Sequence, residues 1–422
     1  IHNVSMRVLI VNTSDSAGGA SIAARRLTEA LINNGVKARM MVADKQTGAI
    51  YVSHTGRRWR YRLAFLWERL VIWIANGLSR KNLFTVSTAC AGVDITQTDE
   101  YREADIIHLH WINQGMLSLG GIRKILSGGK PVVWTMHDMW PVTSVCHYSH
   151  GCEKYHEECS QCPFLRFPGR NDLAAATHRR KKRVMSSGKV HFVAVSSWLG
   201  DKARSASLTR GHDVTVIPNV LSLSHFRMSD RSDSRSLLSI RARHVIIFGA
   251  ARIDTPIKGF GYLKSALAYM TEHMGYRPED LHLLLFGSVR SEEALADIPI
   301  GYTHMGHVAD ETTLSQLYSA ADVLVSSSLY ETFGQTIIEA MACGCTPVSF
   351  DNSGQTDIIR HKQNGYLARY LSAEDLAAGI DWALQAKLPR RDLRKDVMCR
   401  YSESTVAGKY IQLYNSISGT QA

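Results

Sequence analysis

Two glutamates, Glu331 and Glu339, stand eight residues apart in a segment suited to binding a sugar and a phosphate together. A short apolar run at 322–326 precedes them and predicts a buried strand, a helical pattern begins after Gly334, and another strand is expected at 346–350. This is the core of a βαβ unit. Ionised carboxylates accept hydrogen bonds from sugar hydroxyls, and a helix N-terminus offers N–H groups to a phosphate.

An ordinary surface helix with two solvated glutamates would show the same spacing. The strand before the pair, the Phe333-Gly334 dipeptide between the glutamates and the sequence EAMACG that follows favour the functional interpretation.

The first part of the chain predicts a doubly wound α/β domain. A strand at 7–12 leads into a loop that contains Gly18 and Gly19, and a helix is expected at 21–34. Such a loop, at the carboxyl end of the first strand, faces the ligand crevice. A tight turn without a ligand would look similar.

Histidines end two further predicted strands, at 104–111 and 131–137. His137 lies at a carboxyl strand end, where side chains reach the crevice, and we favour a functional role over a purely structural one. For His108 and His110 a structural role is at least as well supported.

Length, charge and cysteine content restrict the number of domains, the partners and the compartment of this protein. A chain of 422 residues predicts two or three domains, and its net charge of +11 suits anionic partners such as nucleotides, acidic lipids or nucleic acid. No apolar run approaches the roughly 20 residues needed to span a bilayer. Eight cysteines without a secretory signal indicate a reducing compartment, so we expect a cytoplasmic protein.

Tryptophans and arginines alternate through 57–84. One or two helices with an apolar face and a basic rim suit a membrane interface or a lipid-linked acceptor. A helix packed on the core, with solvated arginines, explains the pattern equally well. The basic run at 178–183 is interpreted as a solvated helix face, and no nucleic-acid partner is expected.

Four cysteines are concentrated at 146–162, in a loop without apolar periodicity, and they suit a structural zinc ion. Disulfides and free thiols are the alternatives. Four thiolate ligands would leave no open position for a catalytic zinc. The predicted ligands are Cys146, Cys152, Cys159 and Cys162.

The pair Glu331 and Glu339, followed by Ala-Met-Ala-x-Gly at 340–344, resembles the donor-site signature of retaining GT-B glycosyltransferases of the family-4 type. The cysteine pattern, just after His-Asp-x-Trp, resembles a bacterial exopolysaccharide subgroup of the colanic-acid type. The resemblance implies an α/β protein with two Rossmann-like doubly wound domains facing a cleft, and a C-terminal helix that crosses back to the first domain.

The implied domain boundaries are an acceptor-side domain at 6–222, a linker at 223–243, a donor domain at 244–398 and the returning helix at 399–422. The cysteine-rich insert belongs to the first of these domains.

The resemblance also implies residue roles. Glu339 would bind the ribose, Glu331 would hold the donor sugar, and His137 would contact that sugar and the positive charge that develops on it. Arg252 and Lys258 would clamp the diphosphate, and the segment 304–308 would face the nucleobase. The remaining implied donor-site residues are Gly18, Gly19, Val308, Phe333, Gly334 and Gln335.

The expected activity is retaining, metal-independent transfer of a sugar from a UDP- or GDP-sugar to a saccharide or lipid-linked saccharide, in bacterial surface polysaccharide synthesis. No cofactor is expected for catalysis. The enzyme would be cytoplasmic, with peripheral contact at the inner face of the membrane through 57–84. The alternatives are a GT-B sugar-nucleotide epimerase and a non-catalytic protein that binds nucleotide sugars or nucleic acid.

Overall fold

The computed structural model describes residues 6–56 and 58–419. Arg57, at the start of the Trp- and Arg-rich region, and the last three residues of the predicted C-terminal segment lie outside this description. The chain divides into two compact units. The first comprises residues 1–220 and 406–422, and the second comprises residues 221–405.

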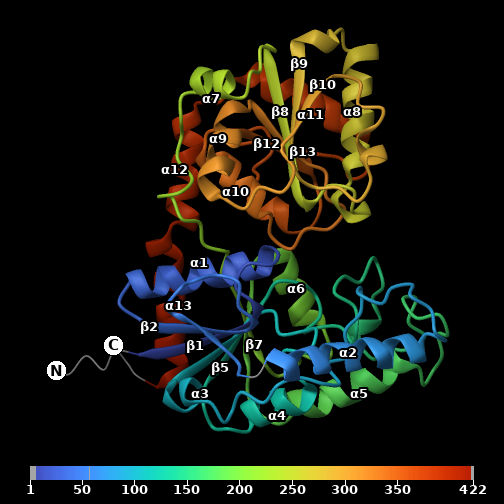
Figure 1. The fold of residues 1–422 in the computed structure, drawn as a ribbon, viewed down its shortest axis with the longest axis vertical. Coiled ribbons are helices and arrows are strands. Elements are labelled where there is room, and N and C mark those ends of the chain that lie inside the picture. Colours follow the sequence, from blue (N-terminus) through green and yellow to red (C-terminus); the bar gives the residue numbers. More distant parts are fainter. Residues whose placement is uncertain (1–5, 57, 420–422) are drawn as a thin grey trace. The chain divides into compact units, whose positions relative to one another are not determined.

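The first unit is built on a parallel sheet with the strand order β3-β2-β1-β4-β5-β6-β7 (Figure 1). Its strands are apolar and almost fully buried near the centre, as expected for a sheet covered by helices on both faces. They are β1 (Arg7–Ser14), β2 (Lys37–Asp44), β3 (Val52–His54), β4 (Ile106–Leu109), β5 (Val132–Met136), β6 (His191–Ala194) and β7 (Asp213–Val216).

Helices connect these strands, and a C-terminal helix completes the core. Tyr410 and Tyr414 of that helix are buried against the apolar side chains of β1, β2 and α1. The helices are α1 (Gly19–Asn33), α2 (Arg58–Ala75), α3 (Asp99–Glu103), α4 (Leu119–Leu126), α5 (Leu173–Met185), α6 (Ser197–Ser205) and, from residue 406 onward, α13 (Glu403–Ser418).

The second unit repeats the architecture with the order β10-β9-β8-β11-β12-β13, again parallel. Its strands are β8 (His244–Arg252), β9 (Leu281–Ser288), β10 (Gly301–His304), β11 (Val323–Ser326), β12 (Thr346–Phe350) and β13 (Tyr366–Ala368). Its helices are α7 (Arg231–Leu237), α8 (Phe260–His273), α9 (Glu311–Ala320), α10 (Gln335–Ala342), α11 (Ala373–Ala386) and α12 (Arg390–Tyr401).

The structure therefore confirms the predicted fold class of two doubly wound α/β units with a C-terminal helix that returns to the first. In each sheet the strand order reverses once beside the first strand, between β1 and β4 and between β8 and β11. Ligands of such sheets bind outside the carboxyl ends of the strands at these switch points.

The serine-rich stretch 223–243, expected as a linker, lies within the second unit. It contains α7, whose Arg235 pairs with Asp322 at 2.6 Å. A stretch of polar composition can thus form a packed helix, because charged side chains such as Arg235 are bound in ion pairs. Across the described residues, no helix has the length and apolar character required for a membrane span.

Candidate functional site

Two loops meet at the switch point of the second unit. Strand β8 ends at Arg252, the loop after it carries Lys258, and the loop after β11 carries Glu331. The Lys258 ammonium lies 2.8 Å from a carboxylate oxygen of Glu331. The structure therefore brings together two side chains that are 73 residues apart, and both remain partly accessible to solvent.

Close backbone packing holds these loops together. The Leu329 N–H donates to the Ile257 carbonyl at 2.8 Å, and the Ser327 hydroxyl donates to the Gly259 carbonyl at 2.9 Å. Gly259 has a φ of 67°, and a Cβ there would lie 1.9 Å from the Ser327 carbonyl oxygen. Only glycine fits at this contact.

Arg252, the last residue of β8, has different partners from Lys258. Its guanidinium contacts the Asp254 carboxylate at 3.2 Å and the Thr255 hydroxyl at 3.1 Å, and its side chain is largely exposed. The loop therefore presents two cations at the carboxyl edge of β8, and one of them is paired with an acid of its own loop.

The backbone of Glu331 is fixed by the next loop of the sheet. Its N–H donates to the Ser353 hydroxyl at 3.0 Å, and its carbonyl accepts the Gly354 N–H at 2.7 Å. A Cβ on Gly354 would lie 2.1 Å from the Thr332 carbonyl oxygen. Only the fold places the loop after β12, which carries Ser353 and Gly354, beside the loop after β11.

Helix α10 begins directly after Gly334, which has a φ of 106°. No side chain caps this helix start, and Gln335 is its first residue. Phe333 is buried, and its ring packs edge-on against Tyr401 at 5.6 Å between ring centroids. Phe333 therefore anchors the loop that leads into α10.

Glu339 lies one turn inside α10 and is buried. Its carboxylate accepts a hydrogen bond from the Tyr318 hydroxyl of α9 at 3.0 Å. This bond joins α10 to α9. Tyr318 is a partner that the helical pattern of α9 gave no reason to single out.

The segment predicted to face the nucleobase follows β10. His304 donates from Nε2 to the Gly287 carbonyl at 2.7 Å, and the Gly287 N–H donates to the Gly306 carbonyl at 2.7 Å. Val308 is half-buried in this loop. The loop therefore offers backbone groups and an apolar side chain to a ligand.

In the first unit, His110 and His137 follow the adjacent strands β4 and β5. Their rings share a hydrogen bond of 2.8 Å between His110 Nδ1 and His137 Nε2. Burial lowers the pKa of His137 to about 4 and holds the pKa of His110 well below its usual value. Both rings are neutral near pH 7, so they can serve as hydrogen-bonding groups but not as cations.

His108 has a structural role. Its ring bonds to the Tyr414 hydroxyl of α13 and to the Thr135 hydroxyl of β5, each at 2.7 Å. Nε2 of the buried His110 has no hydrogen-bond partner among the described residues. The three histidines therefore divide into one that ties α13 to the sheet and two that meet at the strand ends.

Asp138, the residue after His137, organises a second set of contacts that the sequence analysis missed. It accepts hydrogen bonds from Trp111 Nε1 at 2.7 Å and His147 Nδ1 at 2.6 Å. Burial alone would raise its pKa, but the His147 charge and the hydrogen bonds outweigh burial and leave the pKa below its usual value. Asp138 is thus a fixed anion beside His137.

Gly18 precedes the first residue of α1, with a φ of 83° and open space around the position that a Cβ would take. Gly18 and Gly19 follow β1, on the other side of the β1/β4 switch point from His110.

The structure does not support the predicted zinc ligands. All four cysteines of the insert have free thiols, and the described residues contain no group of three or more His, Cys, Asp or Glu arranged to hold a metal ion. Burial raises the pKa of Cys146 to about 12 and that of Cys159 to about 11. Burial therefore favours the protonated form of both thiols.

Hydrogen bonds order this part of the chain instead. The buried ammonium of Lys181 on α5 donates to the carbonyls of Trp140, Thr143 and Ser144. The Asp172 carboxylate accepts the Cys162 N–H at 2.8 Å. Lys181 belongs to the basic run at 178–183, which was interpreted as a solvated helix face, and this interpretation is wrong for His178 and Lys181 because both are buried. The carbonyls that Lys181 binds lie just before the cysteine-rich insert, so α5 fixes the segment from which the insert begins.

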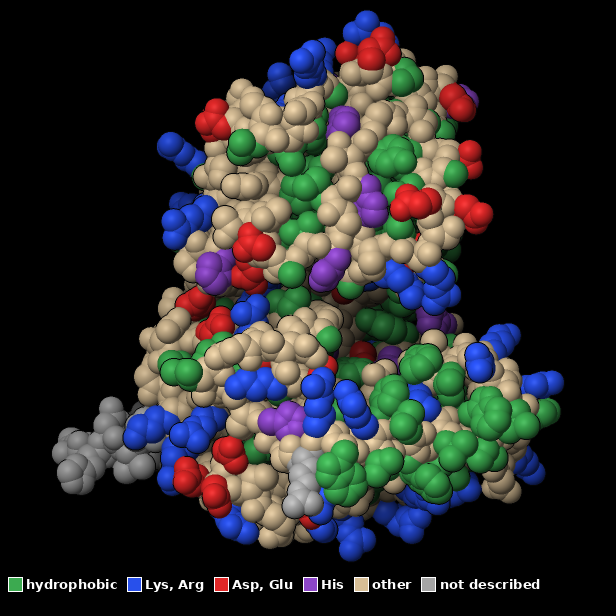
Figure 2. Space-filling view, viewed as in Figure 1, with side chains coloured by type: hydrophobic (Ala, Val, Ile, Leu, Met, Phe, Trp, Pro, Cys, Tyr) green, Lys and Arg blue, Asp and Glu red, His purple; other side chains and the backbone are tan. Residues whose placement is uncertain are grey.

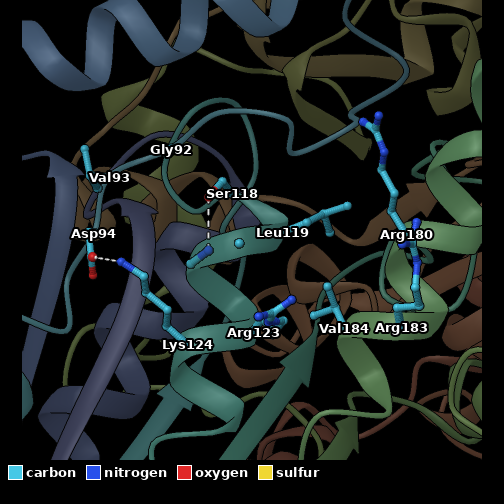
Figure 3. A pocket seen from close by; sticks show the side chains of 12 residues that line it. Gly92, Val93, Asp94, Ser118, Leu119, Arg123, Lys124, Arg180, Arg183 and Val184 are labelled. Atoms are coloured by element: carbon cyan, nitrogen blue, oxygen red, sulfur yellow. Dashed lines mark hydrogen bonds and ion pairs between the residues drawn. The ribbon is translucent and has the colours of Figure 1, made fainter.

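A basic hollow of about 660 Å³ lies between α4 and α5 in the first unit (Figure 3). Arg123, Arg180 and Arg183 line it, and Lys124 is paired with Asp94 at 2.5 Å. The hollow contains none of the predicted site residues, so it is separate from the switch point of this sheet.

Two doubly wound units of this kind, each built on a parallel sheet, make up the GT-B fold. A solved structure of Anabaena HepE, in complex with UDP and glucose, is similar to this protein. The match covers 97% of this chain and 100% of the HepE chain. The TM-score is 0.62 at 16% identity, which shows a shared fold.

Two domain families carry the assignment further. The family described as Glycosyltransferase Family 4 matches residues 17–225, and Glycosyl transferases group 1 matches residues 243–386. The chain is therefore a glycosyltransferase of the GT-B fold.

Curated relatives agree with this assignment. A glycosyltransferase of Methanocaldococcus jannaschii is 25% identical over 81% of this chain and 92% of its own length. A phosphatidyl-myo-inositol mannosyltransferase of Mycobacterium tuberculosis is 26% identical over 50% of this chain and 56% of its own.

Proposed function

We propose that this glycosyltransferase moves a sugar from a UDP- or GDP-sugar to a saccharide or lipid-linked saccharide, with retention at the anomeric carbon. The observation that carries the proposal is the pairing of Lys258 with Glu331 at the β8/β11 switch point, beside the start of α10. A cation, a carboxylate and the N-terminus of a helix suit a diphosphate joined to a sugar.

Charge stabilisation is the main chemical task of this site. Lys258 and Arg252 would bind the diphosphate, and together with the α10 N-terminus they would stabilise the negative charge that grows as the glycosidic bond breaks. When the donor binds, Lys258 would give up part of its contact with Glu331 and would contact the phosphate in its place. Glu331 would turn to the sugar hydroxyls, and Glu339 would bind the ribose.

The departing phosphate would accept the proton of the incoming hydroxyl on the same face of the sugar, which gives retention. The transition state would resemble an oxocarbenium ion, as in glycoside cleavage. In the first unit, His137 is neutral near pH 7 and would act as a hydrogen-bonding group toward the sugar.

Support for the substrates comes from two sources. HepE was solved with UDP-glucose, and one relative is named for a phosphatidyl-myo-inositol acceptor. The proposed place in surface polysaccharide synthesis, on the cytoplasmic side, rests on the resemblance of the cysteine-rich insert to the exopolysaccharide subgroup.

The test is a panel of UDP- and GDP-sugars incubated with the full chain. Slow donor hydrolysis supports a transferase, and an epimeric product supports the epimerase alternative. If no product forms, the result supports a binding protein. Glu331→Ala should lower kcat at least about tenfold, because a contact to the reacting sugar is lost. Glu279→Ala, at an exposed glutamate of the same unit, is the matched control, and a Glu331→Ala rate equal to wild type would contradict the assigned role.

A further inference from the structure

Helix α2 (Arg58–Ala75) has its apolar face turned toward solvent. Six large apolar side chains, Trp59, Leu63, Leu66, Trp67, Leu70 and Ile74, are each 41% to 60% exposed. At roughly 100° per residue they form one stripe along the helix. The reading of 57–84 as a core-packed helix with its apolar face buried therefore does not hold for α2.

Polar contacts fix this orientation. The face opposite the stripe buries Glu68, whose carboxylate accepts the N–H groups of Thr88 and Ala89 at 2.7 Å each. Glu68 also pairs with the buried Arg69 at 3.0 Å, and Arg69 donates to the carbonyls of Leu83 and Val86. Rotating the helix to bury the stripe would break this set of contacts, so the apolar face stays outward.

Neighbouring segments extend the stripe into an apolar patch. Leu78, Phe84 and Phe167 are each about 60% exposed. Phe84 stacks on Phe65 of α2 at 6.5 Å, and the Phe167 ring lies against Gly77. Figure 2 shows these apolar side chains as one gathered area over α2 with Lys and Arg along its border.

The border of the patch is basic. Arg60 and Arg62 flank the stripe on its two sides, and Arg80, Lys81 and Arg166 are exposed beside its far end. The segment 58–84 contains a single acid, Glu68, and that residue is buried. An outward apolar stripe with a cationic rim complements an anionic lipid surface, where rings and aliphatic chains enter the interface and guanidinium groups meet phosphates.

We infer that α2 and the adjoining residues form a membrane-docking face, by which this chain binds the surface of an anionic phospholipid bilayer. A second copy of the chain fits less well, because both copies would present the same basic border and the segment 58–84 offers no exposed acid to pair with it. The helix lies in the interface and does not span it. The inference does not depend on the proposed sugar transfer.

Co-sedimentation of the full chain with vesicles tests this inference without any sugar nucleotide. Wild type should bind vesicles of phosphatidylcholine with 30 mol% phosphatidylglycerol at least about tenfold more tightly than pure phosphatidylcholine, and added salt should weaken the binding. The neutral double variant Leu66→Gln/Leu70→Gln should reduce binding at least about tenfold.

Leu237→Gln is the matched control, since Leu237 is an exposed leucine of the second unit and should leave vesicle binding within twofold of wild type. Unchanged melting curves for all variants exclude misfolding as the cause of a loss. Equal binding by wild type and the double variant would overturn the inference. So would a wild-type dimer in vesicle-free buffer that the double variant dissociates, because the patch would then join two copies.

Discussion

Single residues decide whether the loops after β8 and β11 can approach one another. Gly259 and Ser327 illustrate this, because the backbone of one loop occupies the space that a side chain on the other would need. The Lys258–Glu331 pair depends on that approach, since both side chains extend from these loops.

Gly259→Ala should therefore lower stability by about 1–3 kcal/mol or more and weaken donor binding as well. The added methyl group would lie 1.9 Å from the Ser327 carbonyl oxygen, at a φ of 67°. Urea unfolding and calorimetry with a UDP-sugar measure the two effects.

Gly261→Ala is the matched control. Gly261 lies two residues further along the chain, within α8, and a Cβ there meets nothing within 4 Å. Stability should stay equal or rise slightly, because alanine is the better helix former. If both variants were equally stable, the two loops could separate without lowering the free energy of unfolding.

At the scale of elements, β4, β5 and α13 are joined by buried histidine contacts. His108 connects Thr135 of β5 with Tyr414 of α13, and Thr135 also bonds to Tyr410 at 3.0 Å. A neutral imidazole suits this place, because burial lowers the pKa of His108 to about 3.

This arrangement predicts acid sensitivity. An unfolded histidine takes up a proton below its ordinary pKa of 6.5, whereas folded His108 stays neutral down to about pH 3. Falling pH therefore favours the unfolded chain, and stability should decline below pH 6.5 by about 1.4 kcal/mol per pH unit for this residue.

Denaturant unfolding between pH 5 and 6.5, followed by tryptophan fluorescence, measures this slope. His108→Gln should reduce the slope of unfolding free energy against pH by about 1.4 kcal/mol per pH unit, because one titrating group is removed. Tyr414→Phe keeps the histidine, so it should lower stability without changing the slope. A slope unaffected by His108→Gln would assign the acid sensitivity to other groups.

At the scale of the whole molecule, the first unit is discontinuous in sequence. Residues 406–422 belong to it although the second unit separates them from residues 1–220. Val406, Tyr410 and Tyr414 are buried in its core, so the first unit depends on a segment that follows the second in the chain.

Truncation after Thr405 should therefore destabilise the first unit and spare the second. Loss of these buried side chains should lower the melting temperature of the first unit by roughly 10 °C or more. Calorimetry should then resolve two transitions, with the upper one unchanged. Lys409→Ala, at an exposed position of α13, should leave both transitions in place.

The sequence by itself determined the α/β class and the candidate segments of the second unit. Apolar strands, the helix start after Gly334 and the charged residues at predicted strand ends are local properties, so periodicity and spacing reveal them. The resemblance carried by Glu331 and Glu339 depends on the same short-range spacing.

Only the tertiary structure decided which of these residues meet and which face of a helix is buried. Lys258 reaches Glu331, and His110 reaches His137, because parallel strands distant in sequence end at one edge of a sheet. The four cysteines of the predicted zinc cluster are close in sequence, but the described residues contain no group arranged to hold a metal ion, because spacing along a loop does not fix how its side chains are arranged in space. The stripe of α2 points outward because Glu68 finds the Thr88 and Ala89 N–H groups, a long-range contact that no helical period encodes.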